Sequence, residues 1–298
     1  MELQHKMTKK SMTVSLILLF CLGLVRQADS QVNPFGAGYF SDQYLFNPAV
    51  AGSSAKLLDV NAGYREEMLS FADSPSNAFL TGTYGISDKM GLGLNFYQDQ
   101  AGLMKTIRVM GTFAWHVTLN ETSKLSFGLS AGMLNSKTDD DSFVGELEES
   151  YKDSRFDADF GAAFSDHKFT LQAAFPCVTN LFNDKENSYG PGFFSAMSYA
   201  FSISNGKKLN ISIIPKLSYR DYENYDDVFD AGVNLGFFDN RIEIFGMYHT
   251  TENITVGLDV RIIKRLSLMA FLTSPAPELK KYSDGSLEFG MSMRLGKL

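Results

Sequence analysis

Three histidines beyond residue 30 are the side chains best suited to acid–base chemistry near neutral pH. His116 and His249 fall on the polar faces of alternating segments, and His167 falls in a short turn. Ser126 and Ser130 lie in the segment that follows the one with His116. A hydrolase would need such a Ser–His pair, with a third group that orients the imidazole. Because any two adjacent strands would offer such a pair by chance, catalysis is the weaker interpretation.

An acidic stretch at residues 139–149 could offer carboxylate oxygens to Ca²⁺. It lacks the Asp-x-Asp-x-Asp-Gly order of a known calcium loop, so a solvated surface loop is the preferred interpretation. Its acidic residues are Asp139, Asp140, Asp141, Glu146, Glu148 and Glu149.

A second acidic stretch, residues 221–227, has tyrosines between its carboxylates. Aromatic residues are enriched where proteins contact one another. We therefore expect this stretch to be an extracellular loop that contacts a partner protein through Tyr222, Tyr225, Asp226 and Asp227. Beyond these stretches the sequence indicates no catalytic residues, no metal ligands and no cofactor.

Charge and cysteine content exclude several classes of protein. The 298 residues carry a net charge of −7, which is unsuited to nucleic acid because phosphates demand a basic surface. Of the two cysteines only Cys177 lies beyond residue 30, so an internal disulfide framework is excluded there.

The first thirty residues are typical of a secretory signal peptide, with cleavage expected before Gln31. Lysines precede an apolar run at 14–25, which is shorter than the roughly 20 residues of a spanning helix. A lipoprotein signal at Cys21 is the alternative, although Phe20 stands where a small residue is expected. Cleavage removes four basic and two acidic residues, which leaves 23 basic and 32 acidic residues and a net charge of −9.

Alternation with a period of two dominates the remaining chain. In residues 124–133, KLSFGLSAGM, every second residue is apolar and the others are small or polar. Successive side chains of a strand point to opposite faces, so such a strand has one apolar face. We count about fourteen segments of this kind: 57–67, 78–87, 90–98, 105–119, 123–135, 156–165, 167–175, 192–204, 208–220, 228–238, 241–249, 253–263, 265–273 and 286–296.

The connections between these segments favour a membrane barrel over a water-soluble sandwich. Six short connections alternate with seven longer, polar ones, among them 99–104, 136–155, 176–191 and 221–227. Short turns at one rim and long loops at the other are typical of outer-membrane barrels. The predicted fold is an all-β, transmembrane antiparallel β-barrel of about 14 strands. It has short periplasmic turns, longer extracellular loops and both ends of the chain on the periplasmic side.

Lipid explains why the two faces differ. A sheet survives in hydrocarbon only when it closes and leaves no edge, with its apolar row outward. A charge facing lipid at mid-depth would cost about 2–4 kcal/mol. The ionisable residues expected inside are Arg108, Asp157, Asp159, Lys216, Asp259, Arg261 and Arg294. The aromatic residues expected near the membrane interfaces are Trp115, Tyr97, Tyr219, Tyr222, Tyr225 and Tyr248.

The stretch before the first strand, YFSDQYLFNPAVAGS at 39–53, has neither a helical nor an alternating pattern. Pro48 keeps Asn47 extended and prevents a helix there. Aromatic residues outside strands need burial, so we expect this segment to tuck into the lumen or its periplasmic mouth; a disordered lead-in is the alternative. The residues expected to form this plug or to contact partners are Tyr39, Phe40, Tyr44, Leu45, Phe46, Asn47 and Pro48. The domains are then 1–30 (signal peptide), 31–56 (N-terminal segment) and 57–298 (barrel).

Three stretches carry a family resemblance: Phe40 with 43–53, NAGYR at 61–65, and MGLGLNFYQDQAG at 90–102. With them, the mature chain resembles the PorP/SprF family of type IX secretion system membrane proteins of Bacteroidetes. One departure is that family members often carry a second Asn-Pro before the Ala-Gly-Ser, whereas this chain has one.

The resemblance implies a non-enzymatic protein of the cell outer membrane. It would assist export or surface anchoring of cargo proteins with a type IX C-terminal signal, such as adhesins in gliding relatives. Its partners would be this cargo, periplasmic secretion, motor or peptidoglycan-anchoring components, and outer-membrane lipid, but not nucleic acid. A folded cargo domain should not fit a lumen of this size, which favours docking. The alternative function is a channel or carrier for small or hydrophobic solutes.

Overall fold

The computed structural model describes residues 38, 41–69, 74–138, 152–178, 191–204, 210–222, 226–277, 280–281 and 283–296. The expected signal peptide, Tyr39, Phe40, Tyr225 and the acidic stretch 139–149 lie outside these residues. Within the described ranges, no helix has the length and apolar character needed to cross a membrane.

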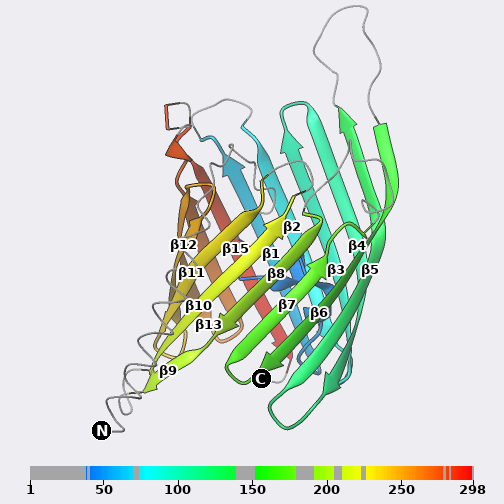
Figure 1. The fold of residues 1–298 in the computed structure, drawn as a ribbon, viewed down its shortest axis with the longest axis vertical. Coiled ribbons are helices and arrows are strands. Elements are labelled where there is room, and N and C mark those ends of the chain that lie inside the picture. The colour runs from blue at the N-terminus through cyan, green and yellow to red at the C-terminus, as the bar shows by residue number, and fades with distance from the viewer. Residues whose placement is uncertain are drawn as a thin grey trace, which may run out of the picture.

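Fourteen antiparallel strands close into a barrel (Figure 1), which confirms the predicted fold. They are β1 (Leu57–Glu67), β2 (Ser76–Gly85), β3 (Met90–Ala101), β4 (Met104–Thr118), β5 (Lys124–Thr138), β6 (Lys152–Asp166), β7 (Phe169–Phe175), β8 (Phe193–Tyr199), β10 (Asn210–Asp221), β11 (Val228–Phe237), β12 (Ile242–His249), β13 (Ile254–Ile263), β14 (Leu266–Thr273) and β15 (Ser286–Gly296). The first strand, β1, pairs with both β2 and the last strand, β15, which closes the ring.

The segment predicted as one strand at 192–204 is interrupted in the structure. β8 ends at Tyr199 and a short strand, β9 (Phe201–Ser204), follows it. Both pair with β10, and their common register places Pro215 opposite Tyr199. Proline has no N–H, so one ladder hydrogen bond cannot form at this point. Within the described residues β9 pairs only with β10.

The connections are mostly short at one end of the barrel and longer at the other, as predicted. The hairpin of β3 and β4 departs most from this pattern. Its connection, predicted to be long at 99–104, consists of Gly102 and Leu103 because both strands continue further than their alternation indicated. Gly102 has a φ of +57°, which glycine adopts without steric cost in a tight turn. In an outer-membrane barrel the short turns face the periplasm, and we name the two ends accordingly.

Side chains alternate between the lumen and the lipid-facing wall. On β4, Met110 and His116 are buried whereas Phe113 and Trp115 are exposed on the outside. The prediction that ionisable side chains face the lumen is confirmed for Arg108, Asp157 and Asp159, which are all buried inside the barrel.

The predicted aromatic belt is correct in part. Trp115 and Tyr248 are exposed on the outer wall, and the Tyr219 ring contacts the Phe229 ring at 4.6 Å. Tyr97 and Tyr222 are instead buried, 2% and 8% exposed, so the prediction was wrong for these two. Tyr97 shares the inward-facing row of β3 with Asn95. The alternation along the strand therefore points its side chain into the lumen, although it lies near a strand end.

Candidate functional site in the barrel lumen

Residues 41–53, which we call the luminal segment, pack inside the barrel as two single-turn 3₁₀ helices. These are η2 (Gln43–Leu45) and η3 (Pro48–Val50). The side chain of Asp42 accepts a hydrogen bond from Tyr44 N–H, and that of Asn47 accepts one from Ala49 N–H. Both are N-caps, which satisfy backbone donors that a short helix leaves open. Pro48 follows its cap at the first helical position, where its missing N–H costs nothing.

The luminal segment is tied to β4, β6 and β7 by side-chain hydrogen bonds. Asn47 Nδ2 donates to the carbonyl of Ala162 and to Gln172 Oε1, both at 3.1 Å. The Tyr44 hydroxyl lies 2.6 Å from Thr112 Oγ1. Asn47 is fully buried, and its partners lie 115 and 125 residues away in the chain. Sequence alone could therefore propose burial of this residue but not its partners.

Glycines on the inner wall let the segment approach the strands closely. A Cβ added at Gly128 would lie 2.2 Å from the carbonyl carbon of Pro48, and one at Gly161 would lie 2.1 Å from Asn47 Oδ1. At Gly91 it would lie 2.0 Å from the carbonyl oxygen of Ala51. No side chain fits at such distances, so β3, β5 and β6 form a surface that accepts the backbone of the luminal segment.

An apolar layer lies across the lumen where the segment meets the wall. Phe46 of the segment stacks on Phe194 of β8 with ring centroids 4.9 Å apart, and Phe245 contacts Phe271 at 5.5 Å. Of the predicted plug residues, Tyr44, Leu45, Phe46, Asn47 and Pro48 are all buried in the lumen. The other buried members of the layer are Phe79, Tyr97, Ala174, Met247 and Met269.

Asp42 makes the attachment of the segment sensitive to pH. Burial raises the pKa of its carboxyl to about 6, although hydrogen bonds from Thr81 and Tyr44 favour the charged form. The attached segment then binds a proton more readily than the released one, whose carboxyl has an ordinary pKa near 3.8. Attachment is therefore strongest below pH 4, weakens as pH rises to about 6, and stays at that weaker level above it.

We expect chymotrypsin to cleave the luminal segment slowly at pH 4.5 and faster at pH 7, after correction for protease activity. In Asp42→Asn the amide keeps a cap oxygen but cannot ionise, so the extra protection at pH 4.5 should be lost. An equal pH response in the wild type and the variant would show that Asp42 is not the titrating group.

His116 and Ser126, the pair that could have suggested a hydrolase, are hydrogen-bonded at 2.8 Å. The other imidazole nitrogen, Nε2, donates to the carbonyl of Ala51 at 3.1 Å, so Nδ1 accepts from the serine. His116 is fully buried, and no carboxylate orients it within the described residues. The pair therefore holds the luminal segment in place.

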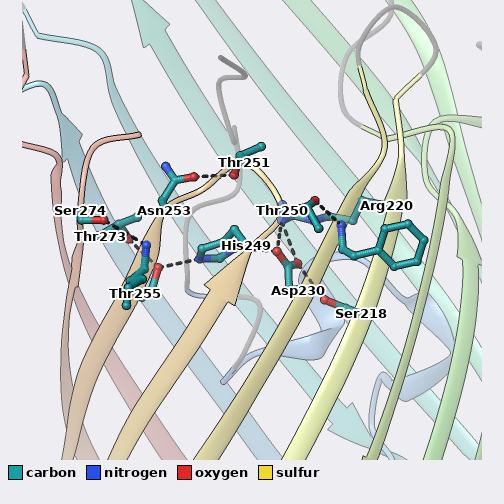
Figure 2. Close-up of polar contacts among 12 residues, drawn as sticks. Ser218, Arg220, Asp230, His249, Thr250, Thr251, Asn253, Thr255, Thr273 and Ser274 are labelled. Carbon is teal, nitrogen blue, oxygen red and sulfur yellow. Dashed lines mark hydrogen bonds and ion pairs between the residues drawn. The ribbon is translucent and has the colours of Figure 1, made fainter. Parts of the chain in front are cut away.

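A polar network lies nearer the extracellular end on β10 to β14 (Figure 2). Asp230 accepts two hydrogen bonds from Arg220 Nη2, at 2.8 and 3.0 Å, and one from His249 Nδ1 at 2.6 Å. His249 Nε2 lies 2.8 Å from Thr255 Oγ1, which in turn lies 2.8 Å from Thr273 Oγ1. Arg220 and Asp230 are both at least 97% buried, and a buried ion pair needs such additional hydrogen bonds.

The order carboxylate, imidazole, hydroxyl resembles a catalytic triad in geometry, but Thr255 is 2% exposed. A small pocket of about 90 Å³ is lined by His249 but not by Thr255. This network is therefore built to hold strands together. The sequence interpretation singled out neither Arg220 nor Asp230, although their even spacing with other polar inward residues was a signal that could have found them.

A second buried ion cluster involves the cysteine. Arg108 Nε donates to Asp157 at 2.7 Å, and its Nη2 donates to Asp159. Asp159 also accepts from the backbone N–H of Cys177 at 2.9 Å. Asp157, Asp159 and Cys177 are close enough to hold a metal ion, but the guanidinium already supplies the positive charge, and burial raises the pKa of the Cys177 thiol. The residues therefore fit an ion-pair network better than a metal site.

One residue of the predicted extracellular partner loop, Tyr222, is buried and not exposed as predicted. Asp226 and Asp227 are exposed, and Asp227 accepts a hydrogen bond from the Tyr219 hydroxyl at 2.9 Å. Tyr222 is buried, with its hydroxyl 3.5 Å from Arg220 Nη1. Tyr222 is therefore part of the internal polar network and does not face an outside partner.

Below the luminal segment lies a cavity of about 680 Å³ at the periplasmic end. Its inner limit includes Asp42 and Tyr44, and its wall includes Asp59 and Asp259. The lumen thus has an open periplasmic cavity, a central apolar layer and a polar extracellular layer.

A family model described as "Type IX secretion system membrane protein PorP/SprF" matches residues 28–293. The chain belongs to the PorP/SprF family. This family and the barrel fold place it in the outer membrane. No curated protein matches the chain.

Several solved outer-membrane proteins are similar in structure to this PorP/SprF chain. The CymD monoaromatic hydrocarbon channel has 8% identity and a TM-score of 0.50, with 89% of this chain and 94% of that chain covered. The Acinetobacter baumannii outer membrane protein Omp33 has 8% identity and a TM-score of 0.47, covering 82% and 100%. The P. putida toluene transporter TodX has 7% identity and a TM-score of 0.48, covering 85% and 94%. At such identities the likeness to CymD shows the fold alone.

Proposed function

We propose that this PorP/SprF protein assists type IX secretion by docking cargo and machinery components, without conducting cargo through its lumen. The supporting observation is the filled lumen: the luminal segment and the apolar layer of Phe46, Phe194, Phe245 and Phe271 occupy the middle of the barrel. Even without the luminal segment, a barrel of this strand number is too narrow for a folded domain, so a folded cargo domain has no route through it.

In this proposal the protein is not an enzyme, and residues 1–30 are a signal peptide that directs export. The cargo bears a type IX C-terminal signal, and an adhesin used in gliding is one example. Contacts with cargo are made by the extracellular loops, where Asp226 and Asp227 are exposed, and contacts with periplasmic components are made at the open end.

A channel or carrier for small solutes is the competing function, because CymD, a hydrocarbon channel, has the same fold. Both functions can be tested in one strain that lacks the gene. We expect surface display of a cargo protein to fall to background, measured by antibody labelling of intact cells, and uptake of small solutes to be unchanged. Complementation with the wild-type gene should restore display. Normal display together with lost solute uptake would replace the secretion proposal by the channel.

A further inference from the structure

Basic residues gather at the periplasmic end of β12 to β15. Lys264 and Arg265 form the turn between β13 and β14. Backbone hydrogen bonds join this turn to its neighbours: Arg261 N–H donates to the Arg241 carbonyl at 2.9 Å, and Arg294 N–H donates to the Arg265 carbonyl at 2.8 Å. We call these five residues the basic cluster.

Most charges of the basic cluster have no carboxylate partner. Arg294 forms an exposed ion pair with Asp59 at 3.3 Å. Arg261 and Arg265 donate instead to backbone carbonyls, at 3.1 and 3.4 Å, and Arg261 also interacts electrostatically with Asp259 on the same strand. Within the described part of the chain, the members without an ion pair are Arg241, Arg261, Lys264 and Arg265. A local excess of positive charge thus stands on a chain whose net charge is −7.

The basic cluster lies on one side of the opening of the periplasmic cavity. All of its members except Arg241 line the cavity. Further inside, Glu243 lies opposite Asp259 and Lys216 also lines the cavity, so the lining is basic at the opening and mixed in charge inside. A volume of about 680 Å³ is within the roughly 300–1,000 Å³ of sites that enclose a drug-sized ligand, which is more space than a single small anion needs.

We propose that the basic cluster is a docking site for an acidic polypeptide segment of a periplasmic partner, which rests in the opening of the cavity. Carboxylates of the segment pair with Arg261, Lys264 and Arg265, and the carboxylates of Glu243 and Asp259 oppose deeper entry on that wall. Lipid headgroups surround the outer wall, whereas these side chains line the luminal opening, so a peptide fits this position better than a phospholipid. This inference rests on the proposed docking function and names the chemistry of one partner.

The test measures binding of a fluorescent peptide of five alternating Asp and Glu residues to the full protein in neutral detergent, by anisotropy at low salt. A matched peptide of Asn and Gln is the neutral probe. Lys264→Glu with Arg265→Glu is expected to weaken binding of the acidic peptide about tenfold or more, because attraction becomes repulsion. Raising the salt concentration should weaken wild-type binding as well.

Lys89→Glu with Lys168→Glu is the control pair, because both residues lie at other periplasmic turns and neither lines the cavity. It should bind the acidic peptide as the wild type does, and both double variants should retain the gel mobility of a folded barrel. Equal binding of the neutral peptide, or an equal loss in the control pair, would overturn the proposal. Displacement of the peptide by phosphatidylglycerol nanodiscs through the same residues would overturn it in favour of lipid.

Failure of this inference can be told apart from failure of the proposed function. Absent peptide binding together with lost cargo display in the deletion strain would reject the acidic partner alone. Tight peptide binding with normal cargo display would instead reject the secretion role.

Discussion

Replacement of Arg108 by methionine is expected to destabilise the barrel by about 3–5 kcal/mol, because it leaves buried carboxylates without their cation. Arg108 donates to Asp157 at 2.7 Å and also to Asp159. The exposed fractions of these carboxylate residues are 1% and 7%, so water cannot replace the guanidinium. The measurement is the urea midpoint of the folded, faster-migrating band on a gel, with the slope checked for two-state behaviour.

Arg294→Met is the matched control for this experiment. Arg294 also pairs with an aspartate, at 3.3 Å, but its side chain is 55% exposed. An exposed pair contributes about 0–1 kcal/mol, so this variant should unfold close to the wild-type midpoint. Similar midpoints for the two variants would contradict the description of the Arg108 cluster as a buried network.

Gly128→Val combined with Gly161→Val is expected to expel the luminal segment while the strands remain paired. The new Cβ at position 128 would lie 2.2 Å from the backbone of Pro48, and the one at 161 would lie 2.1 Å from Asn47 Oδ1. The Asn47 side chain could move away only by giving up the hydrogen bonds that fix it. Overpacking of this kind costs about 1–3 kcal/mol, which raises the released population about five- to 150-fold. Chymotrypsin cleavage after Tyr44 and Phe46 should accelerate accordingly.

Gly82→Val provides the control, because a Cβ at Gly82 meets nothing within 4 Å. It makes the same chemical change in a strand of the same barrel, so its cleavage rate should match that of the wild type. A double variant whose segment stays protected would show that the glycines are not needed for the close approach.

Much of the barrel could be predicted because alternation is a local property. The strands at 57–67 and 286–296 were predicted with the boundaries that β1 and β15 have in the structure, and their pairing closes the ring. The interruption at Tyr199 was missed, although Pro215 on the partner strand was visible in the sequence. The effect of Pro215 depends on which neighbouring strand loses a hydrogen bond to its backbone nitrogen. The register of strand pairing decides this, and the register cannot be read from the local sequence.

The site was predictable only in outline. Aromatic residues without a strand pattern indicated that Tyr44, Leu45 and Phe46 need burial, and the structure places them in the lumen. Their fixing contacts are long-range, such as His116 with Ala51 across 65 residues. In the sequence, Gly128 is one of several small residues on the polar face of its strand. Nothing in the local sequence indicates that it faces the backbone at Pro48.

The most direct test of a lumen closed by its own N-terminal segment is single-channel recording of the purified full-length protein in a planar lipid bilayer. The account predicts no steady ion conductance for the wild type, and discrete openings after the Gly128→Val, Gly161→Val change releases the segment. A stable conducting pore in the wild type, unchanged in that variant, would contradict it.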